Sequence, residues 1–155
     1  MNRIERVREI IDDILCDQPD VVERRSGFVH LYGVAQAAAL LALQRGLDPE
    51  LATVAGMLHD IDTYRTAPGP DHAARSADEA RRILLEAGSF AAEEIEAICA
   101  AVRHHSDKGA VHGSLDELLK DADLWQHYLY NVTLPPHEGH AQRRDALRRE
   151  FSVDG

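Results

Sequence analysis

Cysteine, aromatic residues and strand-like alternation are all scarce in this chain. The 155 residues include two cysteines and only 5% aromatic residues. Cys16 and Cys99 lack the Cys-x-x-Cys spacing of a redox pair or a thiolate metal site, so each is interpreted as a small, buried side chain in a reducing compartment. No stretch alternates apolar and polar residues over the length of a strand. The 45% of hydrophobic residues, rich in Ala and Leu, instead favour helices that pack closely together.

Positive charge is also in short supply. Seventeen Lys and Arg residues stand against 27 Asp and Glu residues, which gives a formal net charge of −10. Binding to duplex nucleic acid is therefore not expected, because neutralising the phosphates requires clustered basic residues. A small phosphorylated molecule remains a plausible partner if a cation lies between it and the protein.

The chain lacks the apolar stretches that a membrane protein requires. No apolar run approaches the roughly 18–20 residues needed to span a bilayer. The first residues, MNRIERVREIIDD, are too charged and too regularly spaced for a secretory signal. We therefore expect a cytoplasmic protein without a membrane partner, while a homodimer remains open.

Helical periodicity dominates the sequence. Gly46 and Gly88 follow apolar stretches as typical residues after a helix C-terminus. Asp48-Pro49-Glu50 is typical of a helix start, and the run 114–117, Ser-Leu-Asp-Glu, predicts a capping box. The predicted helices cover about 2–16, 28–45, 49–60, 72–87, 91–105, 114–130 and 138–151.

These patterns predict an all-α fold, a bundle of about six or seven helices in a single domain spanning 1–155. The core is expected within about 28–131. The N-terminal helix, 2–16, and the charged C-terminal tail, 138–151, are expected to pack on it.

Several histidines continue the apolar stripes of these helices instead of facing solvent. His30, His59 and His105 each lie three or four residues from apolar neighbours on an inward face, and His104 lies about 100° from His105. One buried neutral histidine is commonplace. Several imidazoles and carboxylates buried together are different, because a bound cation compensates the carboxylate charge.

Two acidic positions complete this pattern. Asp60 follows His59 directly in GMLHDIDTY, at a helix end where the backbone can leave helical geometry and let both side chains reach one ion. In the sixth helix Asp121 and Asp123 point about 200° apart, so only one can face the histidines, and Asp123 is favoured. Imidazole and carboxylate together suit Mn, Fe, Co, Ni or Zn.

The ordered set of His30, the His59-Asp60 pair and an acid in KDADLWQHYLYN resembles the HD superfamily of metal-dependent phosphohydrolases. The segments DHA, AVRHHS and DAD follow in the family's order, and the resemblance runs from about 30 to 131. It implies an all-α bundle, one divalent transition-metal ion and a small phosphorylated substrate. By the resemblance, the metal ligands are His30, His59, Asp60 and Asp123.

Additional histidines raise the question of a second ion. Two-metal members of the superfamily place histidines at positions similar to His72 and the pair His104 and His105. These residues therefore either bind a second ion bridged by Asp60 or act catalytically, as donors to the phosphate or as the acid that protonates the leaving group.

Other features bear on the substrate. Thr63 stands where the guanosine-polyphosphate hydrolases and bacterial deoxynucleotidases have Glu, and no Gly-Tyr-Pro signature of cyclic-dinucleotide phosphodiesterases is present. Those activities are therefore not favoured. Lys108 and Arg103 could neutralise phosphate, or serve as ordinary surface charge, and Tyr64 could hydrogen-bond substrate. Four aromatic residues either stack on a base or belong to the core: Tyr32, Trp125, Tyr128 and Tyr130.

Three functions fit these residues. The favoured one is hydrolysis of a nucleotide or another small phosphate ester by metal-activated water. The second is a diiron oxygenase of the HD type, which uses the same ligands together with the additional histidines. The third is a non-catalytic sensor or interaction module, whose metal site would be closed to substrate.

Overall fold

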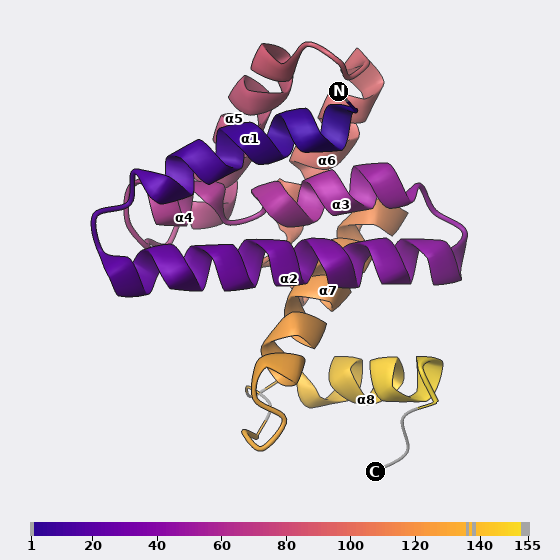
Figure 1. Cartoon of the computed structure of the whole chain (residues 1–155). Coiled ribbons are helices and arrows are strands. Elements are labelled where there is room, and N and C mark those ends of the chain that lie inside the picture. Colours follow the sequence, from indigo (N-terminus) through magenta and orange to yellow (C-terminus); the bar gives the residue numbers. More distant parts are fainter. Residues whose placement is uncertain (1, 136, 138, 153–155) are drawn as a thin grey trace.

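The computed structural model describes residues 2–135, 137 and 139–152. Within these residues the chain forms eight α-helices and no strand, which confirms the all-α prediction (Figure 1). Residue 138, where the C-terminal tail was predicted to begin, lies outside the described residues, as do 1, 136 and 153–155. The helices are α1 (Arg3–Cys16), α2 (Val21–Arg45), α3 (Pro49–Leu58), α4 (Ile61–Arg65), α5 (His72–Ala87), α6 (Ala92–His104), α7 (Ser114–Tyr130) and α8 (Ala141–Glu150).

The long helix α2 organises the bundle. It packs against α3 and α7, and α3 also contacts α1 and α6. In Figure 1, α1, α3 and α2 run alongside one another and α7 crosses them steeply. Helices α5 and α6 pack together at one end, whereas α8 lies against α7 at the other.

Close contact between α2 and α3 depends on Gly56. A Cβ atom at this position would lie 2.6 Å from the Cα of Ala35 and 2.8 Å from its backbone nitrogen. Both are backbone atoms, so they cannot move aside as the end of a side chain would. The missing side chain of Gly56 therefore sets the distance between the two helices that carry His30 and His59.

Local capping explains where the helices begin. Asp48 accepts hydrogen bonds from the backbone of Glu50 and Leu51, and Pro49 occupies the first helical position, as predicted. Helix α2 begins at Val21, earlier than the predicted residue 28, because Asp20 caps it. The first residues of α2 are largely exposed, so they carry none of the apolar periodicity on which the prediction depended.

The predicted capping box of the sixth expected helix is wrong. Gly113 is the N-cap of α7 and Ser114 is its first helical residue, without a side-chain capping bond. The Glu117 carboxylate instead accepts hydrogen bonds from the backbone of His112 and from Lys120. The ion pair between Glu117 and Lys120 therefore takes the place of the predicted capping interaction between Glu117 and Ser114.

By length and composition alone, α2 is apolar enough to cross a membrane, which the sequence analysis did not anticipate. This is weak evidence, because the core helix of a soluble protein passes the same test. Leu31, Val34, Ala38 and Leu41 of α2 are all fully buried within the protein.

Of the two cysteines, Cys99 is buried as predicted, but Cys16 is exposed, so its predicted burial is wrong. Cys16 is the last residue of α1 and lies outside the face of that helix that Val7, Ile11 and Leu15 bury.

Candidate metal centre

The chain changes direction at the His59-Asp60 pair. Helix α3 ends at Leu58, and Asp60 has φ −122° and ψ 18°, outside helical geometry. The five-residue helix α4, which the sequence analysis did not predict, starts directly afterwards. This break brings the Asp60 carboxylate to the side of the His59 ring.

Four imidazole rings are held in one tautomer. The Nδ1 atoms of His59, His72 and His105 donate to backbone carbonyl oxygens of residues three positions earlier, at 2.8, 3.1 and 2.7 Å. The Nδ1 atom of His30 donates to the side-chain oxygen of Gln126 at 2.9 Å. A carbonyl oxygen only accepts, so a hydrogen is on Nδ1, and in the neutral ring each Nε2 atom presents a lone pair, as in metal-binding histidines.

The Asp60 carboxylate lies between two pairs of these nitrogens. Its Oδ2 atom is 3.5 Å from the Nε2 atom of His30 and 3.4 Å from that of His59. Its Oδ1 atom is 3.3 Å from the Nε2 atom of His105 and 3.7 Å from that of His72. Oδ1 is buried and has no hydrogen-bond partner among the described residues.

Asp123 faces the first of the two histidine pairs from α7. Its Oδ1 atom is 3.6 Å from His30 Nε2 and 3.7 Å from His59 Nε2. The same atom is 3.3 Å from the Nε2 atom of His127, one helical turn later. The other oxygen, Oδ2, accepts a hydrogen bond from the ammonium group of Lys108 at 2.7 Å.

The electrostatics of this cluster favour charged acids and a neutral His59 ring. Burial raises the pKa of the Asp60 carboxyl, but His59, His105 and His30 outweigh it and hold that pKa well below its ordinary value. Burial also raises the pKa of Asp123, which His127 and Lys108 lower strongly. Burial lowers the pKa of His59 to about 4, so its ring is neutral near pH 7. For His30, burial is opposed and outweighed by Asp60 and Asp123, which raise its pKa.

These donors fit a transition-metal ion. Three sets of ligand atoms lie within 4.8 Å of one another: His30, His59 and Asp60; His30, Asp123 and His127; Asp60, His72 and His105. Imidazole and carboxylate are the ligands of Zn, Fe, Mn, Co or Ni, whereas Mg and Ca prefer oxygen alone. Unpartnered lone pairs around a buried carboxylate oxygen are what a cation would satisfy.

Some residues singled out from the sequence lie elsewhere. The structure does not bring His104 into the cluster: its Nδ1 atom is 2.5 Å from Asp116, and its ring stacks on His112 with centroids 3.9 Å apart. Arg103 pairs with Asp78 at 2.9 Å. Of the alternatives His104 and His105, only His105 faces Asp60.

Two residues of the cluster were missed. His127 and Gln126 both lie on α7, where His127 is four residues after Asp123 and therefore on the same face. That i, i+4 spacing was a signal in KDADLWQHYLYN. The His127 side chain is 57% exposed, so it does not continue the buried apolar stripe of its helix by which the other histidines were predicted.

Two cavities open onto the cluster. One, of about 290 Å³, is lined by His30, Asp60 and Tyr64 among others. The second, of about 630 Å³, is lined by Asp123, Lys108 and the chain after α7. His127 and Tyr130 border both cavities.

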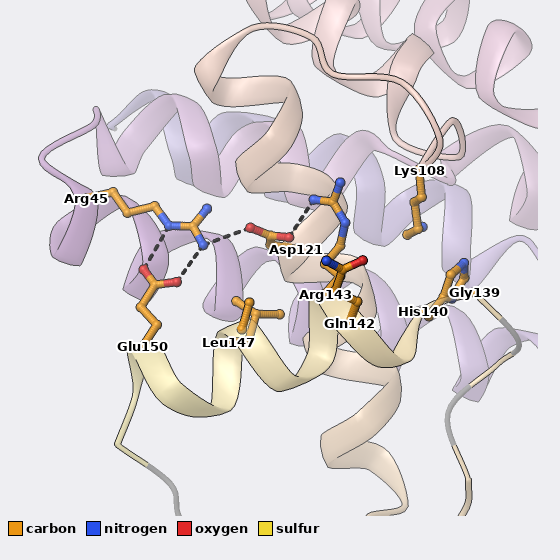
Figure 2. A pocket seen from close by; sticks show the side chains of 10 residues that line it. Arg45, Lys108, Asp121, Gly139, His140, Gln142, Arg143, Leu147 and Glu150 are labelled. Carbon is orange, nitrogen blue, oxygen red and sulfur yellow. Dashed lines mark hydrogen bonds and ion pairs between the residues drawn. The ribbon is translucent and has the colours of Figure 1, made fainter.

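A third cavity, of about 370 Å³, lies beside α8 (Figure 2). None of the cluster's histidines and neither Asp60 nor Asp123 lines it, although Lys108 borders both this cavity and the larger one. The wall of the cavity beside α8 is held by ion pairs from Arg45 to Asp121 and Glu150, at 2.8 and 2.7 Å, and from Arg143 to Asp121 at 2.7 Å. Asp121 thus faces α2 and α8, away from the histidines that Asp123 faces.

Comparison with known proteins agrees with this architecture. The family model described as HD domain matches residues 27–129. A Bacillus subtilis (strain 168) protein named "Putative phosphohydrolase YueE" is 30% identical over 118 residues, which cover 64% of this chain and 65% of that protein. The chain thus spans slightly less than two thirds of that relative's length. No solved structure gives a significant match.

Proposed function

Because this chain belongs to the HD domain family, we propose that it is a metal-dependent phosphohydrolase that acts on a nucleotide or another small phosphate ester. The observation that carries the proposal is the Asp60 carboxylate. Its Oδ1 atom is buried without a hydrogen-bond partner among the described residues, while lone pairs from two histidine pairs point at its two oxygens. The name of the Bacillus subtilis relative supports the reaction class.

The ligands proposed for the first ion are His30, His59, Asp60 and Asp123, which face one another from α2, the end of α3 and α7. A divalent transition-metal ion held by these residues would supply Lewis acidity, which would polarise a phosphoryl oxygen and lower the pKa of a water so that hydroxide can form near neutral pH.

His72 and His105 are proposed as ligands of a second ion that shares Asp60. Their Nδ1–H groups are engaged by the carbonyls of Gly69 and Val102, so each Nε2 atom offers a lone pair toward Oδ1 of Asp60. A neutral ring in this tautomer cannot donate from Nε2 to a phosphate. Metal binding therefore suits these two rings better than the catalytic role considered from the sequence.

His127 is proposed as the residue that protonates the leaving group. Its ring is 57% exposed, lies 3.3 Å from Asp123 and borders both cavities. A histidine that borders both the substrate space and the cluster is placed to donate a proton to an ester oxygen.

Lys108 and Tyr64 are proposed to assist. The Lys108 ammonium group, 2.7 Å from Asp123, fixes that carboxylate and adds positive charge to the larger cavity. Burial and the Asp60 charge raise the pKa of the Tyr64 hydroxyl, so it stays protonated and can donate a hydrogen bond in the smaller cavity.

A diiron oxygenase is the second candidate, because a carboxylate shared by two histidine sets also suits two iron ions. A purely structural metal site is less well supported, since such sites are closed whereas two cavities border this one.

A panel assay tests the hydrolase proposal. The full-length protein, loaded with Mn, Co, Fe, Ni or Zn, is offered nucleotides and simple phosphate esters, and released phosphate is measured. We expect metal-dependent release that Asp60→Ala abolishes and that Asp13→Ala, an exposed change on α1, preserves. Two iron ions per chain with O₂ uptake and no phosphate release would instead support the oxygenase.

A further inference from the structure

Arg25 is a cation without a partner. It is exposed in the second turn of α2, and no described residue forms a side-chain hydrogen bond or ion pair with it. Neighbouring arginines are engaged: Arg24 donates to the carbonyls of Cys16 and Gln18, and Arg75 pairs with Asp62. Arg6 and Arg149 also form no side-chain hydrogen bond or ion pair with a described residue, but neither of them lines any of the three cavities.

The position of Arg25 gives it access to the cluster. It lines the cavity of about 290 Å³ together with Ser26, His30 and Asp60. Four-residue spacing places His30 on the same face of α2 as Ser26, so the helix holds Arg25 beside this opening. Asp60 is the one acidic residue among those that line the cavity, and it is already directed at the histidines.

This arrangement suits a phosphate dianion. The guanidinium group offers planar, paired N–H donors that match phosphate oxygens. The cations of the larger cavity already have partners, since Lys108 pairs with Asp123 and Arg144 with Asp145. Among the described Lys and Arg residues that line these two cavities, Arg25 is therefore the one without an ion-pair partner.

The larger cavity offers a different environment. Tyr130 is 72% exposed and Leu134 is 61% exposed, and both line this space of about 630 Å³ together with Leu124 and Tyr128. Its volume lies within the usual range for small-molecule sites. Trp125, by contrast, is buried in the core, and Tyr32 hydrogen-bonds Asp12, so these two aromatic residues are not available for stacking.

We propose that the two cavities form one substrate cleft, in which Arg25 binds the phosphate and the surface around Tyr130 and Leu134 holds an apolar, ring-containing organic group. The substrate class is thus a phosphate monoester of a nucleoside-sized, ring-bearing alcohol. This inference rests on the proposed hydrolase function. Arg25 and Leu134 both lie outside the family-matched residues 27–129, as expected for residues that distinguish substrates within the family.

Binding of inorganic phosphate tests whether Arg25 binds the phosphate group of the substrate. It is measured by calorimetry on the full-length, metal-loaded protein. We expect Arg25→Gln to raise the Kd for phosphate about tenfold or more, the loss typical of a charge-assisted hydrogen bond. Arg25→Lys should recover part of the affinity. Arg6→Gln removes the same charge from an exposed site on α1 and should leave the Kd unchanged.

Steady-state kinetics tests whether the surface around Tyr130 and Leu134 binds the organic group of the substrate. With p-nitrophenyl phosphate as substrate, Leu134→Asp should raise KM about tenfold and leave the Kd for inorganic phosphate unchanged, because it alters only the apolar lobe. Both variants change exposed side chains, so thermal melts should match the parent. Equal phosphate Kd values for Arg25→Gln and Arg6→Gln would overturn the phosphate assignment, and an unchanged KM in Leu134→Asp would overturn the apolar lobe.

The results also separate this inference from the proposed function. If the parent hydrolyses esters and Arg25→Gln matches it in both phosphate affinity and KM, the hydrolase stands and the Arg25 assignment fails. If Arg25→Gln weakens phosphate binding while no ester is turned over, Arg25 stands as an anion-binding residue and the hydrolase proposal fails.

Discussion

The Nε2 atoms of His30 and His59 lie 3.0 Å apart, although 29 residues separate the two histidines in the chain. The Nδ1 atoms of both rings are engaged by oxygen acceptors, on Gln126 and Gly56. Two bare ring nitrogens at this distance would repel each other, so the contact requires either a proton on His30, whose pKa Asp60 and Asp123 raise, or a metal ion beside both rings. A metal ion would replace that shared proton and bind both nitrogens.

Gly56→Ala should disturb the fold and the centre together. The added methyl group meets the backbone of Ala35, so α3 must move away from α2 and His59 away from His30. Overpacking of this kind costs about 1–3 kcal/mol of unfolding free energy. Chemical denaturation should show that loss, and a metal titration should show weaker binding. Gly109→Ala, where the nearest atom is 3.8 Å away, should change neither.

The acids Asp121 and Asp123 should have separate roles. Asp123→Asn should release metal, because this carboxylate faces His30, His59 and His127. Asp121→Asn should retain metal but lower the unfolding free energy by about 1–3 kcal/mol, since its ion pairs join α7 to α2 and α8. Metal analysis and denaturation on both proteins check this. Equal metal loss in the two variants would show that Asp121 also serves the centre.

The neighbouring histidines provide a matched pair. His105→Ala should reduce the number of bound ions or the affinity for the second one, because His105 faces Oδ1 of Asp60. His104→Ala should leave metal content at the parent level, since its ring faces Asp116 and His112. Native mass spectrometry of the metal-loaded proteins distinguishes the ion counts. A loss of ions in His104→Ala as large as that in His105→Ala would contradict the assignment.

Acid should weaken the attachment of α8. Burial raises the pKa of Glu117, but Lys120, the His112 backbone and Arg143 outweigh it and lower that pKa from 4.5 to about 2. The carboxylate therefore stabilises the fold fully above about pH 4.5, and this contribution is lost as the pH falls toward about 2. Denaturation of metal-free protein should show a steeper loss of stability between these pH values in the parent than in Glu117→Gln. Identical pH profiles would contradict this role of Glu117.

Periodicity and capping residues predicted much of the fold because they act locally. The start of α3 at Pro49 and the end of α5 at Ala87 follow from neighbouring residues alone. The beginning of α2 was missed because its first turn is exposed, and the short helix α4 was missed because Asp60 breaks the helical backbone in an apolar segment. Neither the exposed first turn of α2 nor the non-helical backbone at Asp60 produces a periodic pattern of apolar residues in the sequence.

The candidate site was predictable only in part for a related reason. Inward stripes single out His30, His59 and His105, whose helices bury them. His127 and Arg25 are exposed, and they border cavities that form between α2, α4 and α7 and between α7 and the chain after it. Such spaces arise from the packing of several elements, which no single helix pattern contains.

Anomalous scattering from crystals of protein purified without added metal tests the central claim most directly. We predict a peak bounded by His30, His59, Asp60 and Asp123, with a second peak where Asp60 faces His72 and His105 if two ions bind. Absence of any peak at Asp60, in protein that also takes up no Mn, Fe, Co, Ni or Zn in solution, would contradict the metal centre and the hydrolase built on it.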